Sequence, residues 1–220
     1  MALRIQYQSV GSQVDFSEKE SKITISIIGV MDLYFFISPL TGVLSLLTLG
    51  LYLLIYTPLK QKTEWNTLIG AVPGALPPLG GWVAATGEIN FGAWMLFGLL
   101  FAWQIPHFLA IAWIYKKDYK KAGFKMITTG ENIDLKLKFY IGIFSALVIM
   151  FSIIPSFIGV GGIFYIIGAF FIGFYFIKSS YKMMVNQNHK NAKKLLFATI
   201  IYYPVLLVIF VLDQLVKIKI

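Results

Sequence analysis

The sequence predicts an all-α fold: a polytopic transmembrane helix bundle with about seven spans. Of its 220 residues, 58% are hydrophobic and only 13% are charged, whereas a soluble domain carries about 25% charged residues. The chain also contains long windows without any charge, most of them close to the roughly 20 apolar residues that a helix needs to cross the hydrocarbon core. Membrane β-strands would instead give segments of about 10 alternating residues, which the sequence does not show.

The uncharged windows place the spans in order along the chain. The first is the weakest, because Asp32 lies near its centre. The longest window is too long for one crossing, and Pro155 together with the glycines from Gly159 to Gly162 divides it into two helices. The predicted spans are residues 23–40, 40–59, 67–87, 89–115, the two halves of 139–177, and 195–212.

Lysine and arginine residues predict the orientation. All but two of the 19 cations, Lys217 and Lys219, precede the first span or lie in the connections after spans two, four and six. Because cytoplasmic connections carry the excess of Lys and Arg, we expect a cytoplasmic N-terminal segment, residues 1–22, and a membrane domain, residues 23–220, in the cell (inner) membrane. This placement accounts for the net charge of +9 without a nucleic-acid partner. The absence of cysteine excludes thiolate metal sites and covalent haem attachment.

The fourth span carries the most informative polar residues. Gln104 and His107 are three residues apart and share a helix face. If the helix continued, Asp118 would follow His107 by about three turns, or ~16 Å, with Tyr115 near the same stripe. His107 could line a cavity, or it could satisfy a backbone group freed by Pro106. Asp118 could belong to a solvated charge run at the membrane surface. Beside Lys117 it could equally hold Mg²⁺ on a diphosphate.

The second and third spans leave further alternatives open. Gly70 and Gly74 could allow close helix packing, or the proline-rich third span could bend around a ligand. Lys60 and Lys62, at the end of span two, could be orientation charges or diphosphate partners.

Three segments together resemble the haem O synthase family of UbiA-type intramembrane prenyltransferases. They read YTPLK from Tyr56, NTLIG from Asn66 followed by GALPP from Gly74, and WQIPHF from Trp103 followed by DYKKAG from Asp118. The resemblance extends from about Leu33 to the C-terminus.

The resemblance implies transfer of a farnesyl group from farnesyl diphosphate to a vinyl group of protoheme IX, with Mg²⁺ as cofactor. Asp118 would be the catalytic and metal-binding residue. The bilayer and, by implication, haem A synthase or the terminal oxidase assembly would be partners. The implied substrate-binding residues are Tyr56, Lys60, Lys62, Asn66, Gln104, His107, Tyr115, Lys117 and Tyr119.

The sequence departs from the family pattern in two places. Ala122 stands four residues after Asp118, where related prenyltransferases often carry a second acid. The first acidic motif of the family, NxxxDxxxD, has no counterpart before Leu33, and the family has nine spans. We therefore expect a shortened form with impaired activity. The alternatives are an inactive membrane remnant, a transporter or another ligand-binding membrane protein, and a UbiA-type enzyme with a different acceptor.

Overall fold

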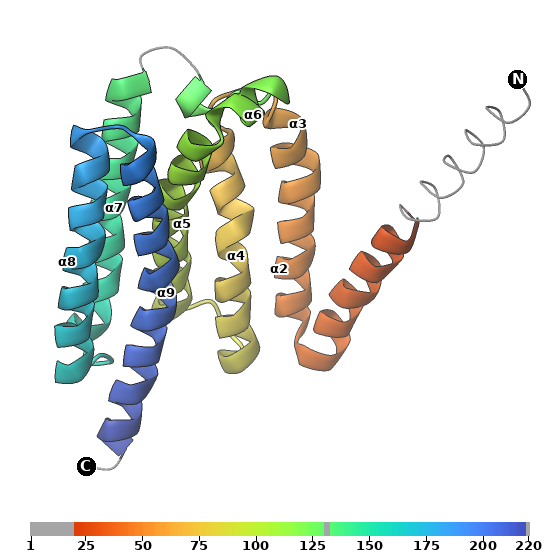
Figure 1. Cartoon of the computed structure of the whole chain (residues 1–220). Coiled ribbons are helices and arrows are strands. Elements are labelled where there is room, and N and C mark those ends of the chain that lie inside the picture. The colour runs from red at the N-terminus through yellow and green to blue at the C-terminus, as the bar shows by residue number, and fades with distance from the viewer. Residues whose placement is uncertain (1–19, 130–132, 219–220) are drawn as a thin grey trace, which may run out of the picture.

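The computed structural model describes residues 20–129 and 133–218 and shows a helical bundle without a β-strand in these ranges (Figure 1). Six helical segments of the described part are long and apolar enough to cross a membrane. They are α2–η2–α3 (Pro39–Gly50, Leu51–Tyr56 and Thr57–Leu59), α4 (Asn66–Thr86), α5 (Phe91–Ile114), α7 (Ile133–Phe157), α8 (Ile163–Val185) and α9 (His189–Ile218). The all-α membrane fold is thus confirmed.

The predicted first span is helical but is not one of these six. Residues 20–37 form a helix that closes with a π-helical stretch, η1 (Leu33–Ile37), and this N-terminal helix carries Asp32 among its apolar residues. It stops because a residue before proline is disfavoured in the helical region. Ser38 accordingly adopts φ −163° and ψ 150°, and its hydroxyl accepts a hydrogen bond from the Thr41 amide to cap α2. Most of the predicted N-terminal segment, residues 1–22, lies outside the described residues.

The six long helices run roughly along one axis, and two short elements lie across one end of the bundle (Figure 1). These elements are α6 (Lys116–Lys121) and η3 (Ile127–Thr129). The connections after α3, α6 and α8 reach this end, which we call the α6 end, whereas those after α4 and α7 lie at the opposite end. The basic connections predicted to share one side therefore do so.

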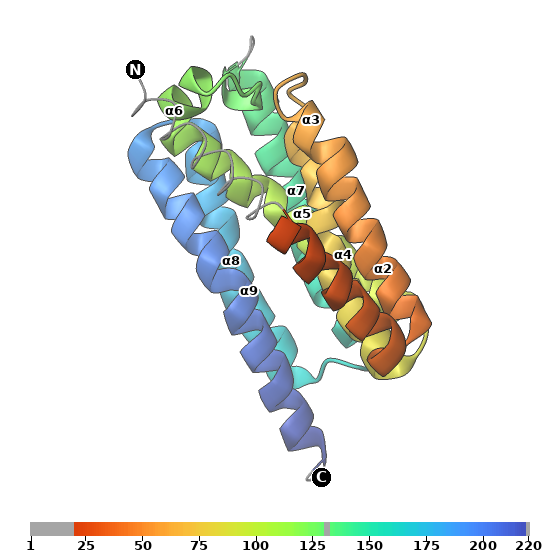
Figure 2. The same ribbon diagram turned by 90° about the vertical axis from the view of Figure 1, so that its right-hand side faces the viewer.

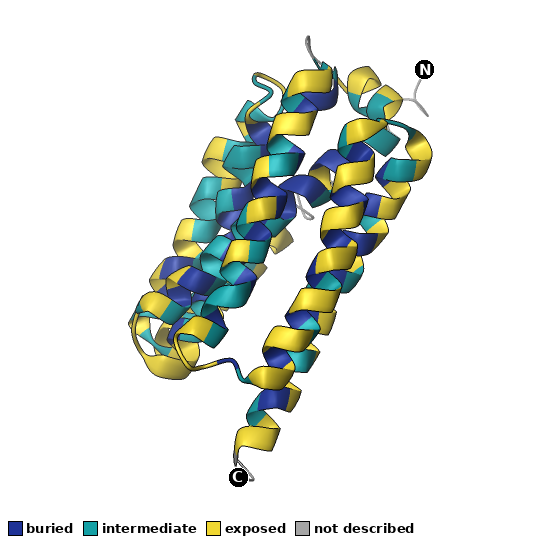
Figure 3. Ribbon diagram, turned by 90° about the vertical axis from the view of Figure 1, so that its left-hand side faces the viewer, coloured by how far each residue is buried: buried dark blue, intermediate teal, exposed yellow. Residues whose placement is uncertain are grey.

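Helix α5 is central to the packing, because it contacts α4, α7 and α9. Its buried face consists largely of small and branched residues, including Ala102, Ile105 and Leu109, which allow neighbouring helices to approach closely. A smaller core joins α2, α4 and α5 around Leu44 and Leu79. Large apolar side chains such as Phe170 are exposed on the outside of the bundle (Figure 3), as expected where lipid is the solvent.

The proline-rich third span forms one uninterrupted helix, α4, with Pro73, Pro77 and Pro78 inside it. A Cβ at Gly70 would come within 2.7 Å of the Tyr56 ring, and one at Gly74 would collide with the Gln104 amide. These two glycines therefore allow close packing, which was one of the two predicted alternatives, and whether α4 also borders a ligand stays a prediction. The helical irregularity lies instead in η2, just before Pro58, where the Thr57 hydroxyl donates to the Tyr52 carbonyl at 2.9 Å.

Candidate active site

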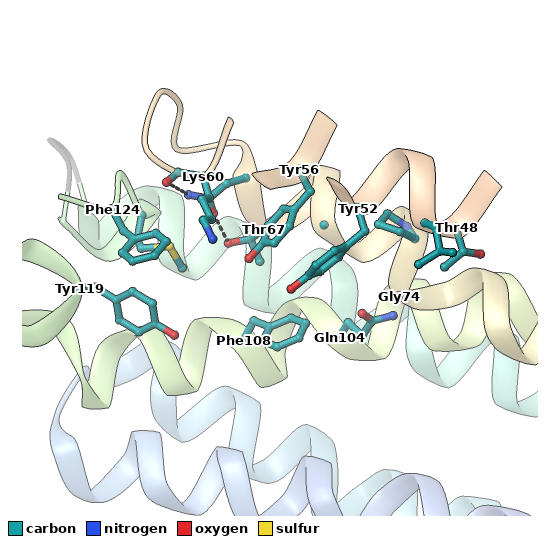
Figure 4. Close-up of a pocket in the computed structure, with 15 residues that line it drawn as sticks. Thr48, Tyr52, Tyr56, Lys60, Thr67, Gly74, Gln104, Phe108, Tyr119 and Phe124 are labelled. Atoms are coloured by element: carbon teal, nitrogen blue, oxygen red, sulfur yellow. Dashed lines mark hydrogen bonds between the residues drawn. The ribbon is translucent and has the colours of Figure 1, made fainter. Parts of the chain in front are cut away.

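A cavity of about 380 Å³ opens near the α6 end, between α2–α3, α4, α5, and α6 with the segment that follows it. Figure 4 shows the side chains that project into it. Its volume falls in the range of small-molecule sites. Five of the predicted site residues line it: Tyr56, Lys60, Asn66, Gln104 and Tyr119.

The outer part of this cavity is polar and cationic. Asn66 is only 2% exposed, and its side-chain amide donates to the main-chain oxygens of Lys60 at 3.1 Å and Lys125 at 2.5 Å. Its carbonyl oxygen accepts a hydrogen bond from the Thr67 hydroxyl at 3.1 Å. Asn66 thus joins two connections and fixes the backbone of Lys60, whose ammonium lies 5.6 Å from the centre of the Phe124 ring.

The middle of the cavity is walled by aromatic rings. Tyr52 and Tyr56 project from η2 with ring centres 5.3 Å apart, and Phe108 lies across from them on α5 (Figure 4). Tyr119 packs edge-on against Phe124 at 5.6 Å. Such a lining suits an apolar ligand, and the faces of aromatic rings also attract positive charge.

Gln104 lies at the inner side of the cavity. It is 5% exposed, and its amide nitrogen donates to the Leu100 carbonyl at 3.2 Å on its own helix. Its amide oxygen faces Gly74 of α4. Gln104 therefore borders the cavity, and its contact with a ligand stays a prediction.

Asp118 lies in a smaller hollow of about 270 Å³ that adjoins the cavity. Tyr119 and Phe124 line both hollows, and Tyr115 and Ala122 complete the smaller one. Asp118 itself is exposed. Lys62 and Lys117 are also exposed and line neither hollow.

The predicted polar stripe from His107 to Asp118 does not exist. Helix α5 ends at Ile114, and Tyr115 (φ −101°, ψ 25°) redirects the chain into α6. The predicted stripe assumed that one unbroken helix continues for three turns from His107 to Asp118, and this assumption is wrong. Residues three apart also differ by about 60° around a helix, which is enough to place Gln104 in the cavity and His107 outside its lining.

His107 instead joins α5 to α9. Its Nδ1 lies 2.8 Å from the Thr199 hydroxyl, and its ring stacks on Trp103, whose indole nitrogen donates to the Thr199 carbonyl at 2.8 Å. The Thr199 hydroxyl also lies 2.6 Å from the Leu196 carbonyl, and which of the two side chains donates in the His107–Thr199 pair depends on the tautomer of His107. Its partner is therefore a side chain of α9, and neither alternative weighed for His107 describes this contact.

Several residues that the sequence analysis missed contribute to the site or to its frame. Tyr52 and Phe108 line the cavity, and each stands four residues from a predicted site residue, a spacing that puts both members of the pair on one helix face. At the opposite end, Asp213 is 2% exposed and accepts hydrogen bonds from the amides of Gly162 at 2.6 Å and Tyr165 at 3.1 Å. A carboxylate at the start of α8 satisfies amides that lack a helical partner.

The described residues do not form a magnesium site by themselves. Asp118 supplies one exposed carboxylate, and the chain from residue 20 onward, where it is described, groups no three His, Cys, Asp or Glu side chains that could hold a metal. Mg²⁺ requires six oxygen ligands in near-octahedral geometry, so this donor set does not fit a preformed site.

Comparison with known proteins gives consistent matches along the chain. Protoheme IX farnesyltransferase of Solibacter usitatus is 34% identical over 192 residues, covering 87% of this chain and 66% of the relative. The proteins of the same name from Salinibacter ruber and Opitutus terrae are 40% and 39% identical, covering 74% and 83% of this chain. The chain spans 57–66% of the length of these three relatives.

A solved structure of digeranylgeranylglyceryl phosphate synthase superposes with a TM-score of 0.75 at 18% identity, over 89% of this chain and 68% of the other. At this identity the likeness establishes the fold. The model of the UbiA prenyltransferase family matches residues 22–201, which include the cavity and five of the six long helices in full. The chain is therefore a multi-pass membrane protein that belongs to the UbiA prenyltransferase family.

Proposed function

We propose that this protein transfers a farnesyl group from farnesyl diphosphate to a vinyl group of protoheme IX, giving haem O. The observation that carries this function is the match to relatives named protoheme IX farnesyltransferase over 74–87% of the chain. The cavity supports it, because a cationic mouth followed by an aromatic wall suits an amphiphile with an anionic head and an apolar tail.

Lys60 would bind the diphosphate at the cavity mouth. Its charge neutralises part of the anion, and the contacts of Asn66 hold its backbone in place. Phosphate oxygens are strong acceptors for ammonium donors. Tyr119 borders the same mouth and offers a hydroxyl. Asp118, in the adjoining hollow, lies on the side from which the diphosphate would enter.

The reaction needs little covalent chemistry from the protein. The bond between the allylic carbon and the diphosphate oxygen breaks, and the diphosphate leaves with the bonding electrons. The π electrons of the acceptor vinyl group then form the new carbon–carbon bond, and the cation left on the other vinyl carbon takes up water and loses a proton, which gives the hydroxyl group of haem O. Tyr52, Tyr56 and Phe108 would keep water from the allylic cation and stabilise its charge with their ring faces. The family resemblance favours Mg²⁺ at Asp118, although the described donors do not by themselves form its site.

We also propose that the membrane is the cell (inner) membrane, with the α6 end cytoplasmic. The lysines in and beside the connections after α3, α6 and α8 support this orientation. A soluble diphosphate would then reach Lys60 from the cytoplasm. Delivery of the product to haem A synthase or to the terminal oxidase assembly is part of the same proposal.

The test uses cells that cannot make haem O. The chain is expressed alone and preceded by a helix pair that carries the first acidic motif of the family, and haem O is measured in extracted membranes. We expect haem O from the extended form and little from the chain alone, because the described part supplies one acidic element. In the extended form Asp118→Asn should abolish haem O, whereas Asp134→Asn, an exposed acid at the start of α7, should not. No haem O from an extended form that accumulates in the membrane would argue against the function.

A further inference from the structure

A second hollow, of about 460 Å³, lies beyond the inner end of the cavity between the N-terminal helix, α2 and α4. Thr48 and Leu49 line both hollows, so the two hollows adjoin at these residues, which we call the waist. From Lys60 to Thr48 the cavity follows α2–η2–α3 for about 18 Å, and the second hollow continues along α2 to Thr41 for about 10 Å more.

The second hollow is apolar. Its walls include Val30, Leu33, Leu44 and Leu76, and no Lys, Arg, Asp or Glu is among its described lining residues. Two of its lining hydroxyls are turned to their own helices, since Thr48 donates to the Leu44 carbonyl at 2.8 Å and Ser26 to the Lys22 carbonyl at 2.8 Å. A charged group would lose its hydration here without compensation.

The glycines of α4 in the two hollows differ in how much free space lies beside them. At Gly70 and Gly74, in the first cavity, a Cβ would meet Tyr56 or Gln104. At Gly80 and Gly81, in the second hollow, a Cβ would meet no atom within 4 Å. The first pair packs against other side chains, whereas the second pair borders open space that an apolar chain could fill.

We propose that the second hollow receives the far end of an isoprenoid tail whose diphosphate lies at Lys60, and that the waist at Thr48 and Leu49 determines how long a tail is bound. The inference rests on the proposed function, because it takes the ligand to be a prenyl diphosphate. The polarity of the two hollows fixes the direction of the bound ligand. The ammonium of Lys60 lies at the outer end of the first cavity, and the apolar space lies beyond the waist.

The test measures binding of geranyl, farnesyl and geranylgeranyl diphosphate to the purified chain in detergent. The wild-type chain is compared with Thr48→Phe, which narrows the waist, and with Gly80→Leu, which fills the second hollow from a position that has room. The control is Leu47→Phe, because Leu47 adjoins the waist in sequence but is 47% exposed and lines neither hollow. Thermal unfolding of each variant shows whether the bundle remains folded.

We expect wild-type affinity to rise with tail length. Thr48→Phe and Gly80→Leu should weaken geranylgeranyl diphosphate about tenfold or more, because several methylene groups lose an apolar site, and should leave geranyl diphosphate within about twofold. Wild-type affinity that does not depend on tail length would overturn the inference while leaving the proposed function intact. Equal losses of affinity for all three ligands would also overturn the inference, as would the same length-selective loss of affinity in Leu47→Phe. Failure of the wild-type chain to bind any of the three would overturn the tail site, whereas the proposed function is overturned by the absence of haem O from the extended form.

Discussion

The side-chain amide of Asn66 donates a hydrogen bond to the Lys125 main-chain oxygen at 2.5 Å, across 59 residues of sequence. The same nitrogen donates to the Lys60 carbonyl, and the Lys125 amide in turn donates to that carbonyl at 3.4 Å. These contacts connect the turn after α3 to the segment before η3. Asn66 therefore shapes the cavity mouth through the main chain, and its amide protons are already committed.

Asn66→Asp should loosen this connection. The carboxylate keeps the shape of the side chain but loses both donated hydrogen bonds and faces two carbonyl oxygens. We expect a loss of about 1–3 kcal/mol in unfolding free energy, together with weaker binding of farnesyl diphosphate, because Lys60 is no longer held. Thermal unfolding and ligand titration measure the two effects. The exposed Asn186→Asp is the control, and an unfolding curve for Asn66→Asp that matches this control would contradict the structural role.

Lys60 and Lys62 form a matched pair for testing the cavity mouth. Lys60 lines the cavity, whereas Lys62 is exposed and does not. Lys60→Gln should lower farnesyl diphosphate affinity about ten- to hundredfold, since a charged hydrogen bond is lost, and Lys62→Gln should change it less than threefold. Salt should weaken binding to the wild-type chain more than to Lys60→Gln. Equal losses in the two variants would show that a diffuse surface charge, rather than Lys60, attracts the ligand.

His107 should matter for stability more than for diphosphate binding. Thr199→Val removes the hydroxyl that pairs with His107 Nδ1 and leaves that nitrogen unpaired between α5 and α9. We expect a loss of about 1–3 kcal/mol in unfolding free energy and farnesyl diphosphate affinity within about twofold of wild type. Calorimetric unfolding and titration of the same sample measure both quantities. A large loss of affinity with unchanged stability would place the Thr199–His107 pair in the ligand site instead.

The sequence was informative where local rules decide the structure. Pro155 and the following glycines were predicted to divide the longest window, and α7 ends at Phe157 while α8 begins at Ile163. Tyr52 and Phe108 could have been found from their spacing to Tyr56 and Gln104. The contacts of Asn66 with Lys125 and of His107 with Thr199 join residues 59 and 92 positions apart, and no local pattern specifies such tertiary partners. The prediction of a polar stripe ending at Asp118 was wrong because the sequence pattern did not predict the helix end at Tyr115.

Asp213 should stabilise the end of the bundle opposite α6. It accepts two amides at the start of α8, and Lys217 on the next turn donates to the carbonyls of Gly159 and Val160. Asp213→Ala leaves both amides without this acceptor, and we expect a loss of about 2–4 kcal/mol in unfolding free energy. Asp213→Asn, which keeps one oxygen acceptor, should lose less. The order of the two variants in thermal unfolding is decisive: if Asn is as damaging as Ala, charge rather than hydrogen bonding is what α8 requires.

Orientation can be tested without any ligand. Lys62 and Lys125 lie in connections at the α6 end, Lys190 lies in the first turn of α9 at the same end, and Glu88 belongs to the connection between α4 and α5 at the other end. A reporter active only in the cytoplasm should work when fused after each of the three lysines and fail after Glu88, because connections rich in Lys stay on the cytoplasmic side. A reporter active only outside the cytoplasm should give the reverse pattern and excludes poor expression as the cause of a negative result. Comparable cytoplasmic activity after Glu88 and Lys125 would overturn the topology. It would also remove the reason for expecting a cytoplasmic diphosphate to reach Lys60 from the α6 end.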